Sequence, residues 1–246
     1  MGSRFEVVAE ATVHAAPDQV WEAIASSAGM DGWFMGDNEV DPRLGGTVET
    51  RLPGFSMRST ISTFEPPHRF VTSSPTSDKG RFDVFSFELE GRAGGTTWLR
   101  LVHSGFLPQD DWEVEYDALQ NGDPAYLAKL VEYVEHFSGR HATPITLWGP
   151  QVDKERAWAG FTAALGVGPQ PKVGDAVRFR ADGIPDLDGE VDYVTRDFLG
   201  FRTADGMYRF IHGMGTVAIG HHVFAPVDRP SVEAAWQAWL DRTFAG

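Results

Sequence analysis

Alternation of apolar and polar side chains along Gly94–Phe106 is the feature that most limits how this chain can fold. One face of the segment carries Leu99, Leu101 and His103, and the other carries Trp98, Arg100 and Val102. Because a strand sends successive side chains to opposite faces, the first set can line an interior. Gly94 and Gly95 predict a tight turn before this strand, and Gly105 predicts a bend after it. The segment therefore predicts a strand with one titratable group, His103, at the end of an apolar stripe.

Other strand-like stretches precede this segment, and a long amphipathic helix follows it. The predicted strands are 5–14, 47–52, 57–64, 69–73 and 81–92, and a short helix is expected over 18–27. Five acidic residues between 110 and 117 are expected to form a solvated loop. Asp123 and Pro124 predict the start of the closing helix, which runs to about Phe137 with apolar residues at helical spacing. These elements predict an α+β helix-grip fold, in which an antiparallel sheet wraps round the long helix and leaves a cavity between them.

The second half of the chain repeats the order of the first on a smaller scale. We expect a helix-grip domain over residues 1–143, a connector over 144–150 and a shorter second domain over 151–246. The second domain is predicted to contain a helix, five strands and a helix. VWEAIASSAG from Val20 echoes AWAGFTAALG from Ala157, which favours a degenerate second copy with less room for a cavity.

Five motifs of the first half occur in the order and spacing of a known family. They are APDQVWEAI at Ala16–Ile24, DPRLGGTVE at Asp41–Glu49, FEPPHRFV at Phe64–Val71, FDVFSFELE at Phe82–Glu90 and GGTTWLRLVHSGF at Gly94–Phe106. Together they resemble the activator-of-heat-shock-protein-90-ATPase-like (AHSA-like) domains of the SRPBCC superfamily, also called START or Bet v 1-like. One departure lies at the closing helix, where such domains usually show a Gly-Trp pair and this chain has Gly122–Tyr126. The resemblance implies the helix-grip fold for the first domain.

Composition excludes several kinds of function. The chain of 246 residues has no cysteine, which excludes disulfides, thiolate metal sites and cysteine nucleophiles. Its net charge of −14 repels phosphate groups, so neither nucleic acid nor a membrane surface is an expected partner. No secretion signal or membrane-crossing stretch is recognised, and a cytoplasmic location is expected. No phosphate-binding loop, dinucleotide fingerprint or zinc-protease motif is present, and no cofactor is expected.

Candidate ligand-binding residues are those that would line the predicted cavity. They are Trp33, Phe34, Met57, Ile61, Phe85, Phe87, Leu101, His103, Leu130 and Tyr133. The same residues would also suit a filled core, because lining and core look alike in a sequence. Trp33 and Phe34 resemble a mobile aromatic gate at a cavity mouth.

Two readings remain open for His103, which is either an ordinary core histidine or a polar contact for a ligand. Burial would lower its pKa and leave a neutral ring that could orient a ligand or act as a general base. No acidic partner is evident at a fixed spacing, so no catalytic residue is assigned. His212, His221 and His222 could in principle form a metal site, but ordinary structural histidines are favoured and no metal is expected.

The favoured function is therefore binding of a small hydrophobic or aromatic ligand by the first domain, without catalysis. Two alternatives follow from the resemblance. One is a stress-related interaction protein linked to a chaperone, and the other is an enzyme on a hydrophobic, polyketide-like substrate. The expected partners are a small hydrophobic molecule, and beyond it a chaperone or a second copy of the chain as a homodimer.

Overall fold

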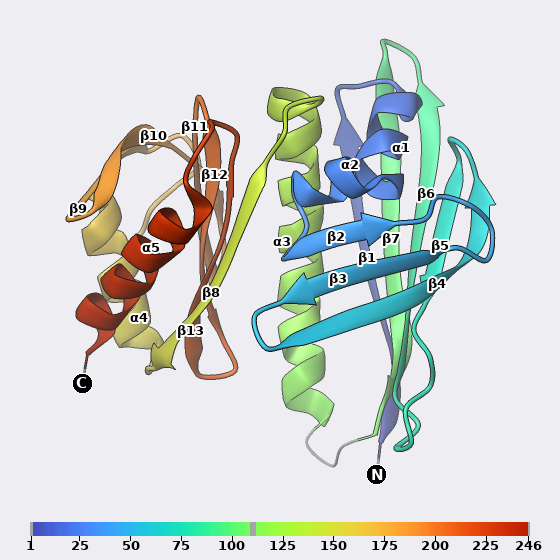
Figure 1. Cartoon of the computed structure of the whole chain (residues 1–246), viewed down its shortest axis with the longest axis horizontal. Coiled ribbons are helices and arrows are strands. Elements are labelled where there is room, and N and C mark those ends of the chain that lie inside the picture. Colours follow the sequence, from blue (N-terminus) through green and yellow to red (C-terminus); the bar gives the residue numbers. More distant parts are fainter. Residues whose placement is uncertain (1, 109–111, 246) are drawn as a thin grey trace. The chain divides into compact units, whose positions relative to one another are not determined.

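The computed structural model describes residues 2–108 and 112–245, and these form two compact units (Figure 1). Unit 1 is Met1–His141 and unit 2 is Ala142–Gly246. Among the described residues, no helix has both the length and the apolar character that a membrane span requires.

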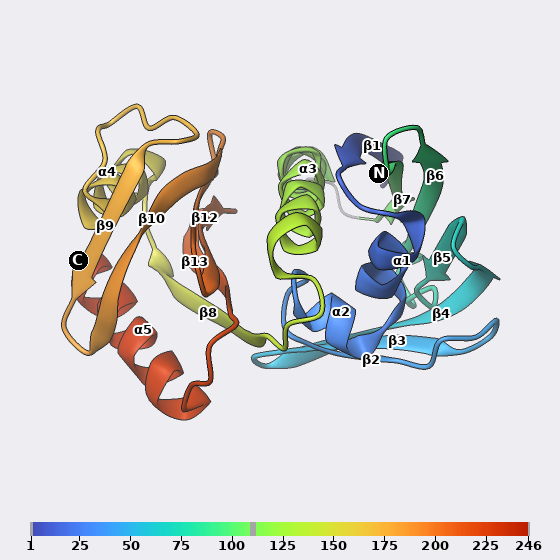
Figure 2. The same cartoon turned by 90° about the horizontal axis from the view of Figure 1, so that it is seen from above.

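Unit 1 is a seven-stranded antiparallel sheet closed by a long helix. Its strands are β1 (Ser3–Val13), β2 (Asp37–Val40), β3 (Thr47–Leu52), β4 (Phe55–Glu65), β5 (Arg69–Ser73), β6 (Phe82–Arg92) and β7 (Thr96–Leu107), in the order β1-β7-β6-β5-β4-β3-β2. Its helices are α1 (Pro17–Ala25), α2 (Ser27–Asp31) and α3 (Trp112–Phe137). Figure 2 shows the sheet curving from β2 to β1, with α3 across its open side. This is the predicted helix-grip arrangement of a sheet and a closing helix.

Strand β7 confirms the alternation predicted from the sequence. Leu99, Leu101 and His103 point inward and are at most 3% exposed, while the residues between them are half-buried. Gly94 and Gly95 make the turn before β7 with φ of 83° and 75°. These positive φ values are easily reached only by glycine.

Gly105 does not form the predicted bend. It lies within β7, opposite Phe5 of β1 and Asp83 of β6. A Cβ at this position would lie 2.9 Å from the Phe5 ring and 2.1 Å from the Phe82 carbonyl oxygen. Glycine is therefore required here for close packing beside His103, and the strand continues.

Helix α3 begins earlier than the sequence predicted. It starts at Trp112 rather than at Pro124, so Glu113, Glu115 and Asp117 lie on the helix and not in a loop. Asp110 and Asp111 lie outside the described residues. Tyr116 and Leu119 continue the apolar stripe backward from Leu127 and pack with Trp112 against β1 and β7. Tertiary packing of these side chains outweighs the helix-breaking tendency of Gly122 and Pro124.

Unit 2 repeats the connectivity of unit 1 with one strand fewer. Its elements are β8 (Thr143–Gln151), α4 (Lys154–Leu165), β9 (Ala176–Ala181), β10 (Ile184–Val194), β11 (Phe198–Thr203), β12 (Gly206–Gly213), β13 (Thr216–Val223) and α5 (Arg229–Phe244). The sheet order is β8-β13-β12-β11-β10-β9, so the first strand pairs with the last, as β1 pairs with β7. Unit 2 is thus a shorter helix-grip-like copy.

Residues 144–150 are part of strand β8 and not the expected connector. Pro144, Gly149 and Pro150 favour a linker, but β8 lies at the edge of the six-stranded sheet and pairs with β13, its one neighbour among the described strands. Proline is tolerated at an edge because one side of the strand needs no ladder hydrogen bond. The second copy consequently begins with a strand, whereas the sequence predicts that it begins with a helix.

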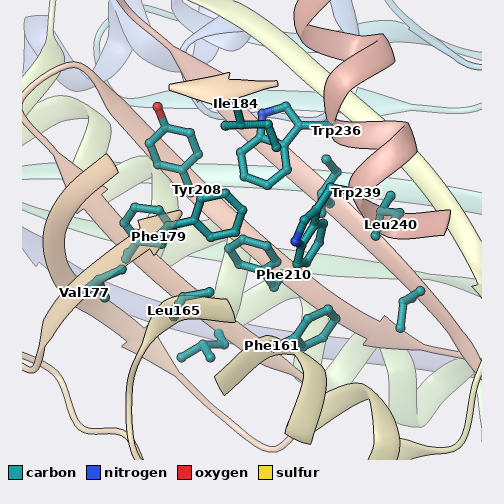
Figure 3. Packing of buried hydrophobic residues seen from close by; sticks show 14 of the residues in the cluster. Phe161, Leu165, Val177, Phe179, Ile184, Tyr208, Phe210, Trp236, Trp239 and Leu240 are labelled. Carbon is teal, nitrogen blue, oxygen red and sulfur yellow. The ribbon is translucent and has the colours of Figure 1, made fainter. Parts of the chain in front are cut away.

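Aromatic side chains occupy the space between the sheet and helices of unit 2 (Figure 3). Phe161 of α4 and Trp236 of α5 are 1% exposed, and Phe179 and Phe210 of the sheet are fully buried. Ring centroids of Phe179 and Trp236 lie 4.9 Å apart. Unit 2 therefore has a packed aromatic core.

Candidate functional site

The candidate site lies on the inner face of unit 1, around His103 of β7. Strand register sets Ile61, Thr72, Phe85, His103 and Val7 side by side in one row across the sheet from β4 to β1. His103 is 3% exposed and is the one titratable side chain in that row. The alternation of β7 thus places a polar ring deep inside an apolar interior.

Two carboxylates face the two nitrogens of this ring. His103 Nδ1 donates a hydrogen bond of 2.9 Å to Asp123 Oδ2 on α3. His103 Nε2 lies 3.4 Å from Asp83 Oδ1 on β6, within ion-pair distance, though neither atom makes a hydrogen bond with the described residues. The ring is therefore held between the sheet and the closing helix.

The ion pairs continue from Asp83 toward solvent. Arg81 Nε lies 3.4 Å from Asp83 Oδ2, and Arg81 Nη1 lies 2.5 Å from Glu115 Oε1 on α3. Asp123, His103, Asp83, Arg81 and Glu115 thus form a sequence of alternating charge, which we name the charge chain. Both of its ends lie on α3, two helical turns apart, while its middle belongs to the sheet side of the unit.

The charge chain reverses the expectation for the pKa of His103. Burial alone lowers that pKa, but the hydrogen bond to Asp123 and the nearby Asp83 outweigh burial, so the pKa is raised. Burial raises the pKa of Asp83, but its interactions with His103 and Arg81 outweigh this, so the pKa is lowered. The pKa expected from the sequence was a lowered one because it took account of burial alone and not of the two carboxylates. The two carboxylates therefore favour the protonated form of the ring, which burial alone would disfavour.

Aromatic rings surround the charged group. Phe85 of β6 stacks on His103, with ring centroids 3.8 Å apart and an interplanar angle of 17°. Phe5 of β1 meets the same ring edge-on at 5.0 Å. Stacking on an aromatic face adds a favourable cation–π contribution when the imidazole is protonated.

A second group of rings extends from Phe87, the next inward residue of β6 after Phe85. Trp33 contacts Phe87 at 6.3 Å and Phe34 at 5.3 Å, and Phe34 contacts Tyr126 of α3 at 5.5 Å. We name Trp33, Phe34, Phe85, Phe87 and Tyr126 the aromatic patch. Phe34, Phe85 and Tyr126 are partly exposed, whereas Trp33 and Phe87 are buried. Burial raises the pKa of the Tyr126 hydroxyl well above its usual range.

The ten residues proposed from the sequence do not all lie together. The buried ones are Trp33, Ile61, Phe87, Leu101, His103, Leu130 and Tyr133, the partly exposed ones are Phe34 and Phe85, and Met57 is 40% exposed. Met57 lies on β4 opposite Thr50 of β3, four residues along the strand from the row that contains His103. Trp33 differs from the expected mobile gate, because it is 2% exposed and its Nε1 donates a hydrogen bond to the Ala23 carbonyl oxygen at 2.9 Å.

Sequence reasoning missed Asp83 and Asp123, although both leave a signal in the pattern. Asp83 precedes Phe85 by two residues and therefore shares its face of β6. Asp123 lies four residues before Leu127, so it falls within the apolar stripe of α3. Pro124, the next residue, instead favours Asp123 as the cap of a helix. A charged residue inside an apolar stripe was the available clue.

The corresponding strand of unit 2 places a histidine beside an aromatic ring of the closing helix. His221 of β13 is fully buried, and its ring centroid lies 4.3 Å from that of Trp236 on α5. Its Nδ1 accepts a hydrogen bond from the Arg209 backbone N–H at 3.1 Å, which requires that nitrogen to be unprotonated. In the described parts of the chain, no three histidine or acidic side chains are grouped to hold a metal ion. In unit 2, α5 places the indole of Trp236 beside His221, whereas in unit 1 α3 places the carboxylate of Asp123 beside His103.

A comparison of the sequence with known protein families finds a match, which lies in unit 1. Residues 14–135, about half of the chain, match the family described as activator of Hsp90 ATPase homolog 1-like protein. Unit 1 is an AHSA1-like domain. The match includes Asp83, His103 and Asp123, and it ends inside α3.

Solved structures similar to the AHSA1-like domain come from several bacteria. Protein MLL2253 from Mesorhizobium loti is 22% identical, with 55% of this chain and 99% of that chain covered and a TM-score of 0.48. The Aha1 dimer from Colwellia psychrerythraea is 18% identical, with 53% and 96% covered and a TM-score of 0.45. No curated protein matches the chain at a significant level.

One similar structure extends over both units. It is the di-domain ARO/CYC BexL from the BE-7585A biosynthetic pathway, 16% identical, with 90% of this chain and 85% of that chain covered and a TM-score of 0.48.

Proposed function

We propose that the AHSA1-like domain binds a small, uncharged hydrophobic molecule with aromatic character against the aromatic patch. The observation that carries this proposal is the partial exposure of Phe34, Phe85 and Tyr126, which come from the loop between α2 and β2, from β6 and from α3. Aromatic side chains left accessible beside a buried polar group are typical of ligand sites, which are mostly apolar with a few polar contacts. By contrast, the equivalent rings of unit 2 are buried against one another.

The charge chain supports binding over catalysis. Both nitrogens of His103 face carboxylates, which favour the protonated ring, and a protonated imidazole has no lone pair with which to accept a proton from a substrate. Counting His103 as protonated, the charge chain holds three carboxylates and two cations and is negative overall. An anionic ligand would be repelled by this charge. Neutral molecules are therefore the expected class.

Equilibrium titration with the neutral fluorophore Nile red tests the proposal. We expect saturable binding to the full chain, and a roughly fivefold weaker Kd for Phe34→Ala, since an aromatic contact contributes about 1 kcal/mol. Val8→Ala is the matched control. Val8 is also partly exposed, at 43%, but it lies on β1 one residue from Val7, on the opposite face of the sheet. Absence of saturable binding, or equal losses in both variants, would contradict the proposal.

A further inference from the structure

Residues 32–36 carry two rings of the aromatic patch, yet they belong to no helix or strand. We name them the aromatic loop. Buried backbone groups in such a segment need hydrogen-bond partners from elsewhere. The loop begins and ends with a glycine in close contact with its surroundings. A Cβ at Gly32 would lie 2.2 Å from the Tyr133 ring. A Cβ at Gly36 would lie 2.2 Å from the Arg51 carbonyl oxygen, so both ends of the loop are closely packed.

The first half of the aromatic loop is fixed by the helices that precede it. The backbone N–H groups of Trp33 and Phe34 donate to the Met30 carbonyl oxygen at 3.1 and 2.8 Å. The indole Nε1 of Trp33 donates to the Ala23 carbonyl oxygen of α1 at 2.9 Å. These bonds reach as far as Phe34, so the residues that follow it need another source of support.

That support comes from Asn38, the second residue of β2, whose side chain turns back toward the loop and is 6% exposed. Asn38 Nδ2 donates to the carbonyl oxygens of Met35 and Gly36, each at 3.3 Å. The same nitrogen lies 3.1 Å from Asp31 Oδ1, which also accepts the Asn38 backbone N–H at 2.7 Å. Because Asp31 is the last residue of α2, Asn38 joins the start of the aromatic loop to its end.

The oxygen of the Asn38 amide is held by β3. Thr50, which is 3% exposed, lies opposite Asn38 in the register of β2 with β3. Its Oγ1 donates to Asn38 Oδ1 at 2.7 Å. Since the amide oxygen takes this bond, the amide nitrogen faces the loop. A buried amide with hydrogen-bond partners at both ends favours one conformation of the segment that it binds.

Phe34 is the loop residue that this arrangement places in the site. Its ring contacts Trp33 at 5.3 Å and Tyr126 of α3 at 5.5 Å, and it is partly exposed. We propose that Asn38 is a positioning residue, which keeps the aromatic loop ordered before a ligand arrives and so holds Phe34 in place against Tyr126. A loop that is already ordered loses less conformational entropy on binding, which raises the affinity. The effect on affinity rests on the proposed function, whereas the order of the loop does not.

Backbone ¹⁵N order parameters, measured on the full chain without a ligand, test the order of the loop. We expect values of about 0.85 for residues 33–36, typical of a rigid backbone, and values below about 0.6 in Asn38→Leu. This variant keeps the branched shape of the side chain and removes its hydrogen bonds. Thr50→Val is the matched control, because it removes one bond of the same buried group without touching the loop, and its order parameters should match those of the unaltered chain. A mobile loop in the unaltered chain, or unchanged order parameters in Asn38→Leu, overturns the proposal.

Titration of the same variants with Nile red tests the effect on binding. We expect a Kd about fivefold weaker in Asn38→Leu, as in Phe34→Ala, and a Kd within about twofold of the unaltered chain in Thr50→Val. The double variant Asn38→Leu/Phe34→Ala should have the Kd of Phe34→Ala, because Asn38 acts through this ring. An asparagine that only stabilised unit 1 would shift the urea midpoint and leave the Kd of the folded protein unchanged. An unchanged Kd in Asn38→Leu, or a full additional loss in the double variant, overturns the positioning role.

Asn38→Ser keeps the test decisive if Asn38→Leu fails to fold. Serine is shorter and carries one hydroxyl in place of the amide, so it cannot donate to Asp31 and to the Met35 carbonyl oxygen together. Its Kd for Nile red should be at least about twofold weaker, and an unchanged Kd overturns the positioning role. If the unaltered chain does not bind Nile red, the proposed function fails, and the order parameters still decide whether Asn38 orders the loop. If the dye binds and the loop is ordered but the Asn38 variants keep the original Kd, the positioning role alone fails.

Discussion

Replacing His103 by leucine gives the sharpest test of the electrostatic account of this site. His103→Leu replaces the polar ring with an apolar side chain of similar reach and leaves Asp83 and Asp123 facing each other across it. Breaking a buried ion pair by removing one partner costs about 3–5 kcal/mol. The Asp83 side chain is 21% exposed and keeps Arg81, so we expect the lower end, about 3 kcal/mol of unfolding free energy at pH 6.

A double-mutant cycle separates this cost from lost packing. Asp123→Leu alone takes from the His103 cation its closer carboxylate and leaves it Asp83 at 3.4 Å, whereas the double variant removes both members of the His103–Asp123 pair. Since replacing both partners by apolar groups is close to neutral, the unfolding free energy lost in the double variant should be about 2 kcal/mol smaller than the sum of the losses in the two single variants. Urea unfolding followed by the NMR methyl signals of Val7 and Leu101 reads unit 1 without interference from unit 2.

The reasoning is refuted if the two single losses add within about 0.5 kcal/mol, because independent sites behave in that way. The exposed pair of His14 and Glu135 provides the control cycle. Its atoms are also 2.9 Å apart, but the His14 side chain is 78% exposed. Its coupling should stay below about 1 kcal/mol.

Three further predictions concern other parts of the chain. Asp83→Asn should lower the pKa of His103, measured from its ring signals in an NMR titration, because one of the two carboxylates that favour protonation is neutralised. An unchanged pKa would show that Asp83 does not favour protonation of His103. Gly32→Ala should destabilise unit 1 by about 1–3 kcal/mol, since the new Cβ would lie 2.2 Å from the Tyr133 ring, whereas Gly122→Ala should stabilise it by about 0.5–1 kcal/mol. Denaturant midpoints measure both changes, and a shift of both midpoints in the same direction would contradict the packing described. Trp236→Ala should cost unit 2 about 3–5 kcal/mol and leave the methyl signals of unit 1 at their original urea midpoint.

Residues with a regular spacing were predictable, and residues whose role depends on a distant partner were not. The alternation of β7 and the stripe of α3 after Leu127 indicated buried faces, because strand and helix periods act over a few neighbouring residues. The charge chain was not predicted, since Asp83, His103 and Asp123 lie about twenty residues apart. Their meeting depends on the register of β6 with β7 and on where α3 crosses the sheet.

The strongest local signals also gave the clearest errors. Asp123 and Pro124 favour a helix start, and Pro144 and Pro150 favour a linker, when each is considered with its neighbours alone. In the folded chain, packing of Tyr116 and Leu119 extends the helix through the first pair, and pairing with β13 turns the second pair into part of an edge strand. Local propensities of about 1–3 kcal/mol are overcome when enough apolar surface is buried.

By itself, the sequence determined the type and order of most elements, the helix-grip architecture of the first unit and the presence of a second copy, because periodicity and turn chemistry are local properties. It did not reveal the strands β2 and β8. Only the tertiary structure decided that His103 is clamped by two carboxylates, which raises its pKa where burial alone would lower it. The sign of that shift is a balance between desolvation and two short ion-pair distances, and those distances exist only once β6, β7 and α3 are assembled.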